Sequence, residues 1–377
     1  MEKARVALVR CNSYGEQEVY EAVRQGVGLL CGVGRFAASG ERLLLKPNVL
    51  NGKPSERAVC THPAVVKAVA RLFRDSGAGL SIGDSPQLGR SAAALESCGI
   101  AAAAREAGLT MADFDHGRSV TLPGSPYTQS FTVARGALEA DGIINLAKLK
   151  THNLTRMTGA VKNLYGCIPG ALKKALHVLH PTAQAFSRML VALNLLLKPR
   201  LHIMDGIVAM EGNGPAAGDP RPMGVLLFSS DPVALDALMC RLVELHPLYV
   251  PSARPGRAWG LGTYVSEEIE LLGDGWSKAV DGDFRVPRGP VLDLSGPGML
   301  TYISNLIGRR PVIVRGACTR CGQCVEACPL DPKAVDWRDG NKNRPPAHSY
   351  LRCIRCYCCQ EACPEGAISV RSTILRL

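Results

Sequence analysis

The cysteines of this chain have a spacing that could support metal chemistry. Nine of the 15 cysteines fall between Cys318 and Cys363, although the chain is 377 residues long. Eight of the nine form two runs with the same pattern, C-x2-C-x2-C-x3-C-P, which begin at Cys318 and Cys353. In such a run, three closely spaced thiolates can bind three corners of an iron–sulfur cube, and the fourth cysteine begins a helix that leads to another cluster. The pattern therefore predicts two iron–sulfur clusters.

The fourth cysteine of each run is expected to bind the cluster of the other run, and this predicts which thiolates share a cluster. One [4Fe–4S] cluster would be bound by Cys318, Cys321, Cys324 and Cys363, and the other by Cys353, Cys356, Cys359 and Cys328. Zinc is the alternative, because it also binds C-x2-C pairs, but a zinc site uses four ligands and two full runs with trailing prolines match it poorly. The ninth cysteine, Cys358, is left over, and we expect it to be a small buried residue beside a cluster.

Residues 314–377 resemble the bacterial-type ferredoxin with two [4Fe–4S] clusters. The resemblance rests on the two cysteine runs and on the prolines that follow them, Pro329 and Pro364. It implies a small α+β domain that transfers electrons at low potential. The expected electron donor is therefore a low-potential ferredoxin or flavodoxin.

A second group of chemically capable residues lies in the first 275 residues and is rich in lysine, amide and histidine side chains. Lysines supply point charges for a carboxylate or phosphate, and histidine can transfer a proton near neutral pH. The expected catalytic residues are His152, Lys150 and Lys162. The expected substrate-binding residues are Lys46, Asn48, Asp84, Asn145, Lys148 and Asn163. The alternatives are that the lysines are solvated surface residues, that His152 hydrogen-bonds the backbone, and that Asp84 caps a helix or forms a turn.

These residues follow segments that are predicted to be strands. Short apolar runs predict strands at 5–9, 43–45, 80–82, 142–146, 201–204 and 225–228, and helical signals occur at 18–30, 63–73, 183–197 and 232–243. Alternating strands and helices are typical of an α/β fold with a mostly parallel sheet covered by helices. Such sheets bind ligands at the carboxyl ends of their strands, so the polar residues should meet there. Two further histidines, His177 and His180, share one face of a predicted helix, but no third ligand for a metal is identified.

The same patterns divide the chain into three regions. Residues 1–275 form the α/β domain, and residues 314–377 form the cysteine-rich domain. Residues 276–313 form a linker rich in proline and glycine, with a short amphipathic stretch at 300–307 that predicts one helix. A chain of this length is consistent with two or three such units.

The α/β region resembles the family called domain of unknown function 362 over roughly residues 5–275. The resemblance rests on six motifs in order: KPN at 46–48, GDSP at 83–86, NLAKLKTH at 145–152, TGAVKNLYG at 158–166, MDGIVAMEGNGP at 204–215 and DPVALDAL at 231–238. Members of this family often carry a ferredoxin domain. The family is distantly similar to lactate racemase, whose chemistry uses histidines and a nickel-bearing nicotinate-derived cofactor. After GDSP this chain has Gln87, Leu88 and Gly89 where more glycine is expected, which argues against a phosphate cradle there.

The composition excludes several other classes of protein. Hydrophobic residues make up 46% and charged residues 20%, which is the balance of a folded globular protein. The net charge is +11, but aromatic residues are only 5%, so an acidic substrate or protein partner fits better than a nucleic acid. No segment approaches roughly 18 consecutive apolar residues, and the N-terminus lacks a cleavable signal pattern. We therefore expect a cytoplasmic protein without a membrane partner.

Three functions are consistent with these features. The first is an iron–sulfur oxidoreductase whose clusters pass low-potential electrons to an anionic substrate, or to a second cofactor, in the α/β cleft. The second is a non-enzymatic electron carrier with a docking domain, and the third is a racemase-like hydride-transfer enzyme with accessory clusters. No GxGxxG pattern follows a strand, which argues against a Rossmann-type nicotinamide site. A carrier does not need polar motifs at successive strand ends, so the sequence favours the first function.

The cysteine runs give the first testable prediction. Protein purified and reconstituted without oxygen should contain about eight iron and eight sulfide ions per chain, because eight thiolates bind two [4Fe–4S] clusters. Iron and acid-labile sulfide assays measure this content. Cys358→Ser should leave it unchanged, since Cys358 lies outside both runs. A preparation that holds only zinc after reconstitution would contradict the prediction.

Overall fold

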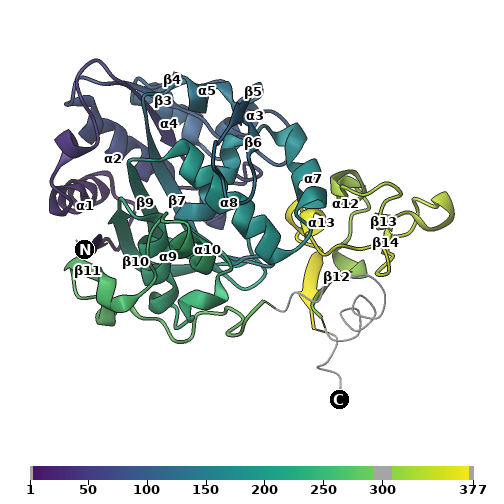
Figure 1. Cartoon of the computed structure of the whole chain (residues 1–377). Coiled ribbons are helices and arrows are strands. Elements are labelled where there is room, and N and C mark those ends of the chain that lie inside the picture. The colour runs from purple at the N-terminus through teal and green to yellow at the C-terminus, as the bar shows by residue number, and fades with distance from the viewer. Residues whose placement is uncertain (1–2, 292–307, 373–377) are drawn as a thin grey trace.

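A nine-stranded mixed sheet forms the centre of the α/β domain (Figure 1). The structure, a computed structural model, describes residues 3–291 and 308–372. The strand order is β11-β1-β10-β9-β7-β2-β3-β4, and β8 pairs with β7 beside this path. The strands are β1 (Ala4–Arg10), β2 (Arg42–Lys46), β3 (Gly79–Ile82), β4 (Thr110–Met111), β7 (Gly142–His152), β8 (Arg156–Thr158), β9 (Leu201–Glu211), β10 (Asp219–Ser229) and β11 (Ile269–Gly273).

Most strand pairs in this sheet are parallel. The central strand β7 is parallel to both β2 and β9, and β2, β3 and β4 continue in the same direction. The strand β1 is also parallel to its neighbour β11. In this sheet, β10 is antiparallel to β1 and β9, and β8 is antiparallel to β7. The prediction of an α/β fold with a mostly parallel sheet is confirmed.

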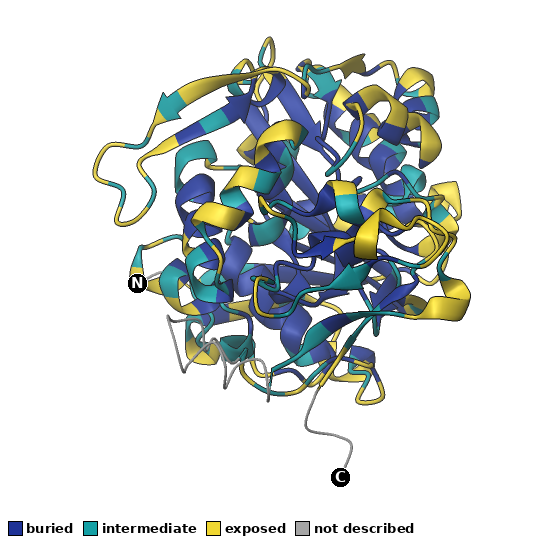
Figure 2. Ribbon diagram, turned by 90° about the vertical axis from the view of Figure 1, so that its right-hand side faces the viewer, coloured by how far each residue is buried: buried dark blue, intermediate teal, exposed yellow. Residues whose placement is uncertain are grey.

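Helices cover both faces of the sheet, and Figure 2 shows its strands buried beneath them. One face carries α1 (Glu16–Leu29), α2 (Pro63–Arg74), α3 (Ser91–Ser97) and α4 (Ile100–Glu106), and the other carries α6 (Ala160–Asn163), α8 (Ala183–Leu197), α9 (Pro232–Leu242) and α10 (Ala253–Ala258). Alternate residues of a strand face opposite sides. In β1, Ala7 and Val9 pack with the first group, whereas Val6 and Leu8 pack with the second. A strand covered on both faces must be apolar throughout, which explains the apolar runs in the sequence.

The remaining elements of the α/β domain lie outside this sheet. They are the hairpin of β5 (Gly117–Thr121) and β6 (Ser130–Ala134), and the helices α5 (Arg135–Leu138) and α7 (Gly170–Leu179). Asp231 caps α9, because its side chain accepts hydrogen bonds from the backbone nitrogens of Val233 and Ala234 at 2.8 Å. Of the helices within residues 3–291 and 308–372, none has the length and apolar character needed to cross a bilayer.

The central strand β7 is longer than the sequence predicts. The apolar run ends near residue 146, whereas the strand continues to His152. Its second half pairs with β8, where Lys150 lies opposite Thr158 and His152 lies opposite Arg156. Lys148, Lys150 and His152 therefore lie on β7 rather than after it. The strand extends this far because β8 supplies backbone hydrogen-bond partners, which the hydrophobic pattern of the sequence does not signal. In the same way β9 continues beyond Met204, so that Asp205 lies within a strand paired with β10.

Residues 308–372 form a small C-terminal domain. The strand β12 (Arg310–Ile313) pairs antiparallel with β15 (Ile368–Arg371), and β13 (Val335–Asp336) pairs with β14 (Ala347–His348). Two short helices, α12 (Gln323–Ala327) and α13 (Cys358–Glu361), lie within the cysteine runs. The segment that the sequence assigns to a linker thus ends in β12, and its start packs on the α/β domain, where Phe284 is fully buried. The predicted helix at 300–307 lies outside the described residues.

The C-terminal domain packs against the α/β domain, and α13 lies on the side that faces it (Figure 1). Gln360 of α13 donates a hydrogen bond to the carbonyl oxygen of Asn213 at 2.9 Å, and Asn213 donates to that of Ile368 at 3.0 Å. Lys53 donates to the carbonyl oxygen of Pro364 at 3.0 Å. These contacts connect the C-terminal domain to the loops that follow β2 and β9, at the edge of the sheet where the sequence predicts a site.

A glycine of α1 gives a prediction about the stability of the fold. A methyl group on Gly26 would lie 2.2 Å from Cε2 of Phe228, a buried ring of β10, so helix and sheet would have to separate. Gly26→Ala should therefore lower the free energy of unfolding by about 1–3 kcal/mol, as measured by urea unfolding of the intact protein. The control is Gly28→Ala on the same helix, because nothing lies within 4 Å of its added methyl group. It should be neutral or stabilising by about 0.5–1 kcal/mol, and equal losses in both variants would contradict the packing argument.

Candidate functional site

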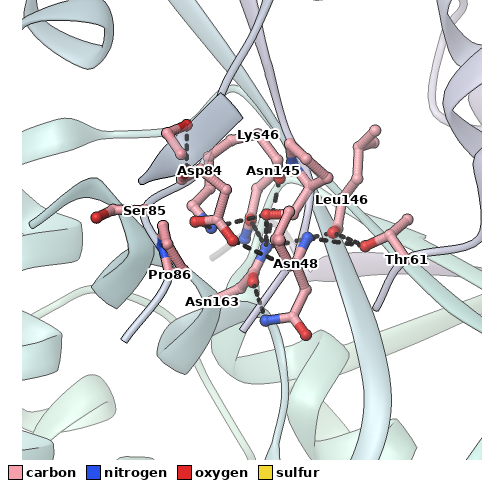
Figure 3. A network of polar contacts seen from close by, with 12 residues as sticks. Lys46, Asn48, Thr61, Asp84, Ser85, Pro86, Asn145, Leu146 and Asn163 are labelled. Carbon is pink, nitrogen blue, oxygen red and sulfur yellow. Dashed lines mark hydrogen bonds and ion pairs between the residues drawn. The ribbon is translucent and has the colours of Figure 1, made fainter. Parts of the chain in front are cut away.

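A buried ion pair joins the carboxyl ends of two neighbouring strands (Figure 3). Lys46 ends β2 and Asp84 follows β3, and their side chains are 0% and 2% exposed. The Nζ atom of Lys46 lies 2.8 Å from Oδ1 of Asp84, and it also donates to the carbonyl oxygen of Pro47 at 2.8 Å. The other oxygen of Asp84 accepts from the backbone nitrogen of Val49 at 2.7 Å. These additional hydrogen bonds offset part of the cost of removing two charges from water.

Three asparagines form a hydrogen-bonded chain beside this ion pair (Figure 3). Asn163 donates to Oδ1 of Asn145 at 2.7 Å, and Asn48 donates to Oδ1 of Asn163 at 2.9 Å. The ammonium group of Lys150 donates to Oδ1 of Asn48 and to the carbonyl oxygen of Val59, both at 2.6 Å. Burial, together with the charge of Lys162, lowers the pKa of Lys150 to about 7. These hydrogen bonds fix the orientation of all three side-chain amides, because the oxygen or nitrogen of each amide is hydrogen-bonded to a neighbour.

Lys148 lies in a separate polar cluster of the same strand. Its Nζ atom lies 2.8 Å from Oδ2 of Asp205 and 2.9 Å from the hydroxyl of Tyr14, which itself donates to Oδ1 of Asp205 at 2.9 Å. The Tyr14 ring stacks on His62 with ring centres 3.6 Å apart. The pairing of β7 with β9 is irregular between Lys148 and Lys150, and the two lysines have different partners. The structure therefore does not bring Lys148 together with the other predicted lysines.

A small cavity lies beside the three asparagines, and about 50 Å³ of it is open to the centres of water-sized molecules. Four of the residues predicted for the site line it: Asn48, Asp84, Lys162 and Asn163. The other five are buried but do not line it: Lys46, Asn145, Lys148, Lys150 and His152. This space is enough for a few water molecules or a small anion, since one water needs roughly 10–15 Å³ on the same measure. Within the part of the chain that the structure describes, Lys162 has no hydrogen bond or ion pair, and burial lowers its pKa.

Several lining residues were not predicted for the site, and two of them lie on α7. Lys173 donates to the carbonyl oxygens of Ser85 and Pro86, and burial lowers its pKa to about 8. His177 lies one turn further along α7 and is 5% exposed; its Nδ1 has no hydrogen-bond partner among the described residues, and burial lowers its pKa to about 4. The spacing of four residues, which places both side chains on one helix face, was the available signal in the sequence. His180 instead contacts the hydroxyl of Tyr127 at 3.2 Å, away from this cavity.

Glu361 of the C-terminal domain also lines the cavity and contacts His152. The Nδ1 atom of His152 accepts from the backbone nitrogens of Leu154 at 3.0 Å and Thr155 at 3.2 Å. Backbone N–H groups can only donate, so the proton of the neutral ring is on Nε2, which lies 3.0 Å from Oε1 of Glu361. Burial, then the charge of Lys162, lowers the pKa of His152 to about 4. His152 therefore links β7 to α13, and nothing in the sequence around Glu361 signals this contact.

The cysteines of the C-terminal domain surround two further cavities. The first is lined by Cys318, Cys321, Cys324 and Cys363, and the second by Cys328, Cys353, Cys356 and Cys359. Each group of four contains the thiols that the sequence assigns to one cluster. Within the described residues, no three or more His, Cys, Asp or Glu side chains converge closely enough to hold a single metal ion. Four thiols around a cavity suit a cubane cluster, which takes one thiolate at each iron.

Backbone amides contact the sulfur atoms of both groups. Ala367 donates to the sulfur of Cys363 at 3.3 Å, and Ala334 donates to that of Cys328 at the same distance. Hydrogen bonds to ligating sulfurs are one of the factors that set a cluster's reduction potential. The spare thiol of Cys358 is fully buried and lines neither cavity.

Comparisons with known proteins agree with this two-part organisation. Residues 43–241 match the family described as Domain of unknown function (DUF362), and residues 317–367 match a 4Fe-4S dicluster domain. A protein of Synechocystis sp. named Thylakoid-associated protein sll1697 is 36% identical over 294 residues, which cover 75% of this chain and 91% of that protein. The lactate racemase apoprotein of Thermoanaerobacterium thermosaccharolyticum has a TM-score of 0.39 and 10% identity, over 62% of this chain and little more than half of that one (55%).

These matches correspond to the motifs and cysteine runs described above. The six α/β motifs all lie between residues 46 and 238, inside the first match, which covers more than half of the chain. The second match contains all eight cysteines of the two runs, so the C-terminal domain is a 4Fe-4S dicluster domain. The chain belongs to the DUF362 family.

Proposed function

We propose that this protein is an iron–sulfur oxidoreductase in which two [4Fe–4S] clusters pass low-potential electrons to an anionic substrate, or to a second cofactor, in the cavity. One observation carries the proposal: Glu361, which lines the cavity, lies two residues from both Cys359 and Cys363. These two cysteines line the two different cysteine cavities. Both cysteine cavities are therefore connected to the cavity wall through the short segment 359–363, which begins in α13.

The electrostatics of the cavity favour an anionic ligand. The two carboxylates in its wall are already engaged, Asp84 by Lys46 and Glu361 by the N–H of His152. The ammonium group of Lys162 has no such partner within the described residues. A carboxylate or phosphate would supply the missing negative charge, and the fixed amides of Asn48 and Asn163 would orient it.

The residues of this chain bind and shield the ligand, while the clusters supply the redox chemistry. When bound, the two clusters provide single electrons at low potential. The cavity walls from both domains would displace part of the water around the ligand, which strengthens the contact with Lys162. We propose a low-potential ferredoxin or flavodoxin as the electron donor, which would approach at Cys321, the exposed thiol of the first group. The cytoplasmic location stays a prediction, since the name of the Synechocystis relative places that protein at a thylakoid.

A non-enzymatic electron carrier remains the second candidate because of one observation. Lys46, Lys148 and Lys150 all have partners within the protein. Residues that are satisfied in this way can serve to hold a docking domain together without binding a substrate. The two functions differ in what Lys162 does, which the next experiment tests.

The role of Lys162 gives a testable prediction. Lys162→Met removes the charge and keeps the aliphatic stem, so the affinity for oxalate, used as a small dianionic probe, should fall about 10- to 100-fold. Titration calorimetry of the iron-loaded protein at low ionic strength measures this affinity. Lys278→Met, which removes an exposed lysine, is the matched control and should bind as the wild type does. If Lys162→Met binds oxalate as tightly as the control, the cavity is not an anion site and the carrier function is favoured.

The redox role of the clusters gives a second prediction. Reduced ferredoxin, added without oxygen, should transfer about one electron to each cluster, because bacterial-type dicluster domains operate at low potential. Electron paramagnetic resonance and the loss of visible absorbance measure the extent of reduction. Clusters that stay oxidised even with dithionite would exclude electron delivery as their role.

A further inference from the structure

The helix that carries Lys162 and Asn163 is too short to hold its own position. It is α6, a single turn from Ala160 to Asn163 between β8 and the 3-10 turn at Leu164–Cys167. Isolated helices shorter than about 12 residues are marginal in water because the first turn is costly to form. The position of Lys162 in the cavity wall must therefore be set by contacts with other elements.

A carboxylate from α9 holds the start of this turn. Oδ1 of Asp236 accepts from the backbone nitrogen of Ala160 at 2.6 Å, and Oδ2 accepts from that of Val161 at 3.2 Å. The residue is 6% exposed, and no cation within the described residues forms an ion pair with it. Burying a carboxylate without a counter-ion is costly unless its oxygens are hydrogen-bonded. The backbone N–H groups of Ala160 and Val161 provide this compensation for the carboxylate of Asp236.

Two buried amides hold the carbonyl oxygens of the same two residues. Asn145 of β7 donates to the carbonyl oxygen of Ala160 at 2.9 Å, and Asn194 of α8 donates to that of Val161 at 2.8 Å. Both asparagines are fully buried. The donor and acceptor groups of Ala160 and Val161 are thus engaged from three elements, directly before Lys162.

The residue before the turn leaves room for the carboxylate. A methyl group on Gly159 would lie 2.0 Å from Oδ1 of Asp236. Gly159 has an extended backbone, with φ at −143°, which other residues can also adopt. A larger residue is therefore excluded at this position by lack of space and not by the backbone conformation. The motif at 158–166 and the motif at 231–238 therefore meet in one contact, which the proposed function does not by itself explain.

We propose that Asp236 is a positioning residue that fixes α6 and thereby holds Lys162 and Asn163 in the wall of the cavity. The proposal rests on the proposed function only for the nature of the ligand, since the placement of α6 can be measured without one. Asp231 offers a matched comparison, because it lies on the same helix and in the same motif but accepts from the start of α9.

The test uses Asp236→Asn in the iron-loaded protein. Asparagine keeps the size of the side chain but has one acceptor oxygen, so its NH2 group would face a backbone N–H. Hydrogen exchange followed by mass spectrometry should show the amides of Ala160 and Val161 exchanging about tenfold faster. Oxalate affinity should fall as it does in Lys162→Met. Adding Asp236→Asn to Lys162→Met should cause much less than the sum of the two separate losses, because both changes act through Lys162 and only the displacement of Asn163 is added.

Two other variants separate positioning from general stability. Asp231→Ala should lower the melting temperature through the loss of a helix cap, while exchange at α6 and oxalate affinity stay as in the wild type. Gly159→Ala should reproduce the effects of Asp236→Asn by displacing the carboxylate, and it serves if Asp236→Asn does not fold. The proposal would be overturned if hydrogen exchange at α6 were unchanged in both Asp236→Asn and Gly159→Ala. It would also be overturned if Asp231→Ala accelerated exchange at α6 as much as Asp236→Asn does. If the wild type binds no oxalate, the proposed function fails, and the exchange result alone decides whether Asp236 positions α6.

Discussion

The buried ion pair of Lys46 and Asp84 is the interaction on which the rest of the site depends. It connects the ends of β2 and β3. It also leaves no space for a side chain at Gly166, in the segment that packs over the pair. A methyl group on Gly166 would lie 1.7 Å from Oδ1 of Asp84 and 2.5 Å from Nζ of Lys46. The backbone after α6 therefore packs directly on the pair, and Ser85 donates to the carbonyl oxygen of Gly166 at 3.0 Å. Loss of either charge would leave the other buried and unpaired, at a cost of about 3–5 kcal/mol.

The cavity is complete only when the two domains are docked. The α/β domain supplies the lysines and asparagines, whereas Glu361 comes from α13, between a cysteine of each cluster site. The neutral ring of His152 is fixed at Nδ1 by two backbone amides, so that Nε2 can hold the carboxylate of Glu361. Gln360 and Asn213 connect the same surfaces by further hydrogen bonds. Docking thus places the 4Fe-4S dicluster domain beside Lys162 and the asparagines, around one volume.

The six sequence motifs of the α/β domain form three pairs in space. KPN meets GDSP through Lys46 and Asp84, and NLAKLKTH meets MDGIVAMEGNGP through Lys148 and Asp205. TGAVKNLYG meets DPVALDAL where Asp236 reaches the backbone next to Gly159. In each pair a buried charge on one motif is compensated by the other, which is the condition for keeping a charge in a protein interior. The motifs therefore compensate one another's buried charges in three separate contacts.

The sequence by itself determined the features that depend on local spacing. Apolar runs predicted six of the nine strands of the sheet, because a strand covered on both faces must be apolar, but they did not signal β4, β8 or β11. The cysteine runs predicted the dicluster domain because a tight loop places its thiolates together. The edge of the sheet that carries the polar residues was also predictable from the strand ends. Only the tertiary structure decided that Lys46, Lys148 and Lys150 are engaged by partners while Lys162 faces the cavity, and that Glu361 closes it. These outcomes depend on distances between segments that are far apart in the chain. Those distances are set by the length of β7, by its pairing with β8 and by the docking of α13. No local sequence pattern encodes them.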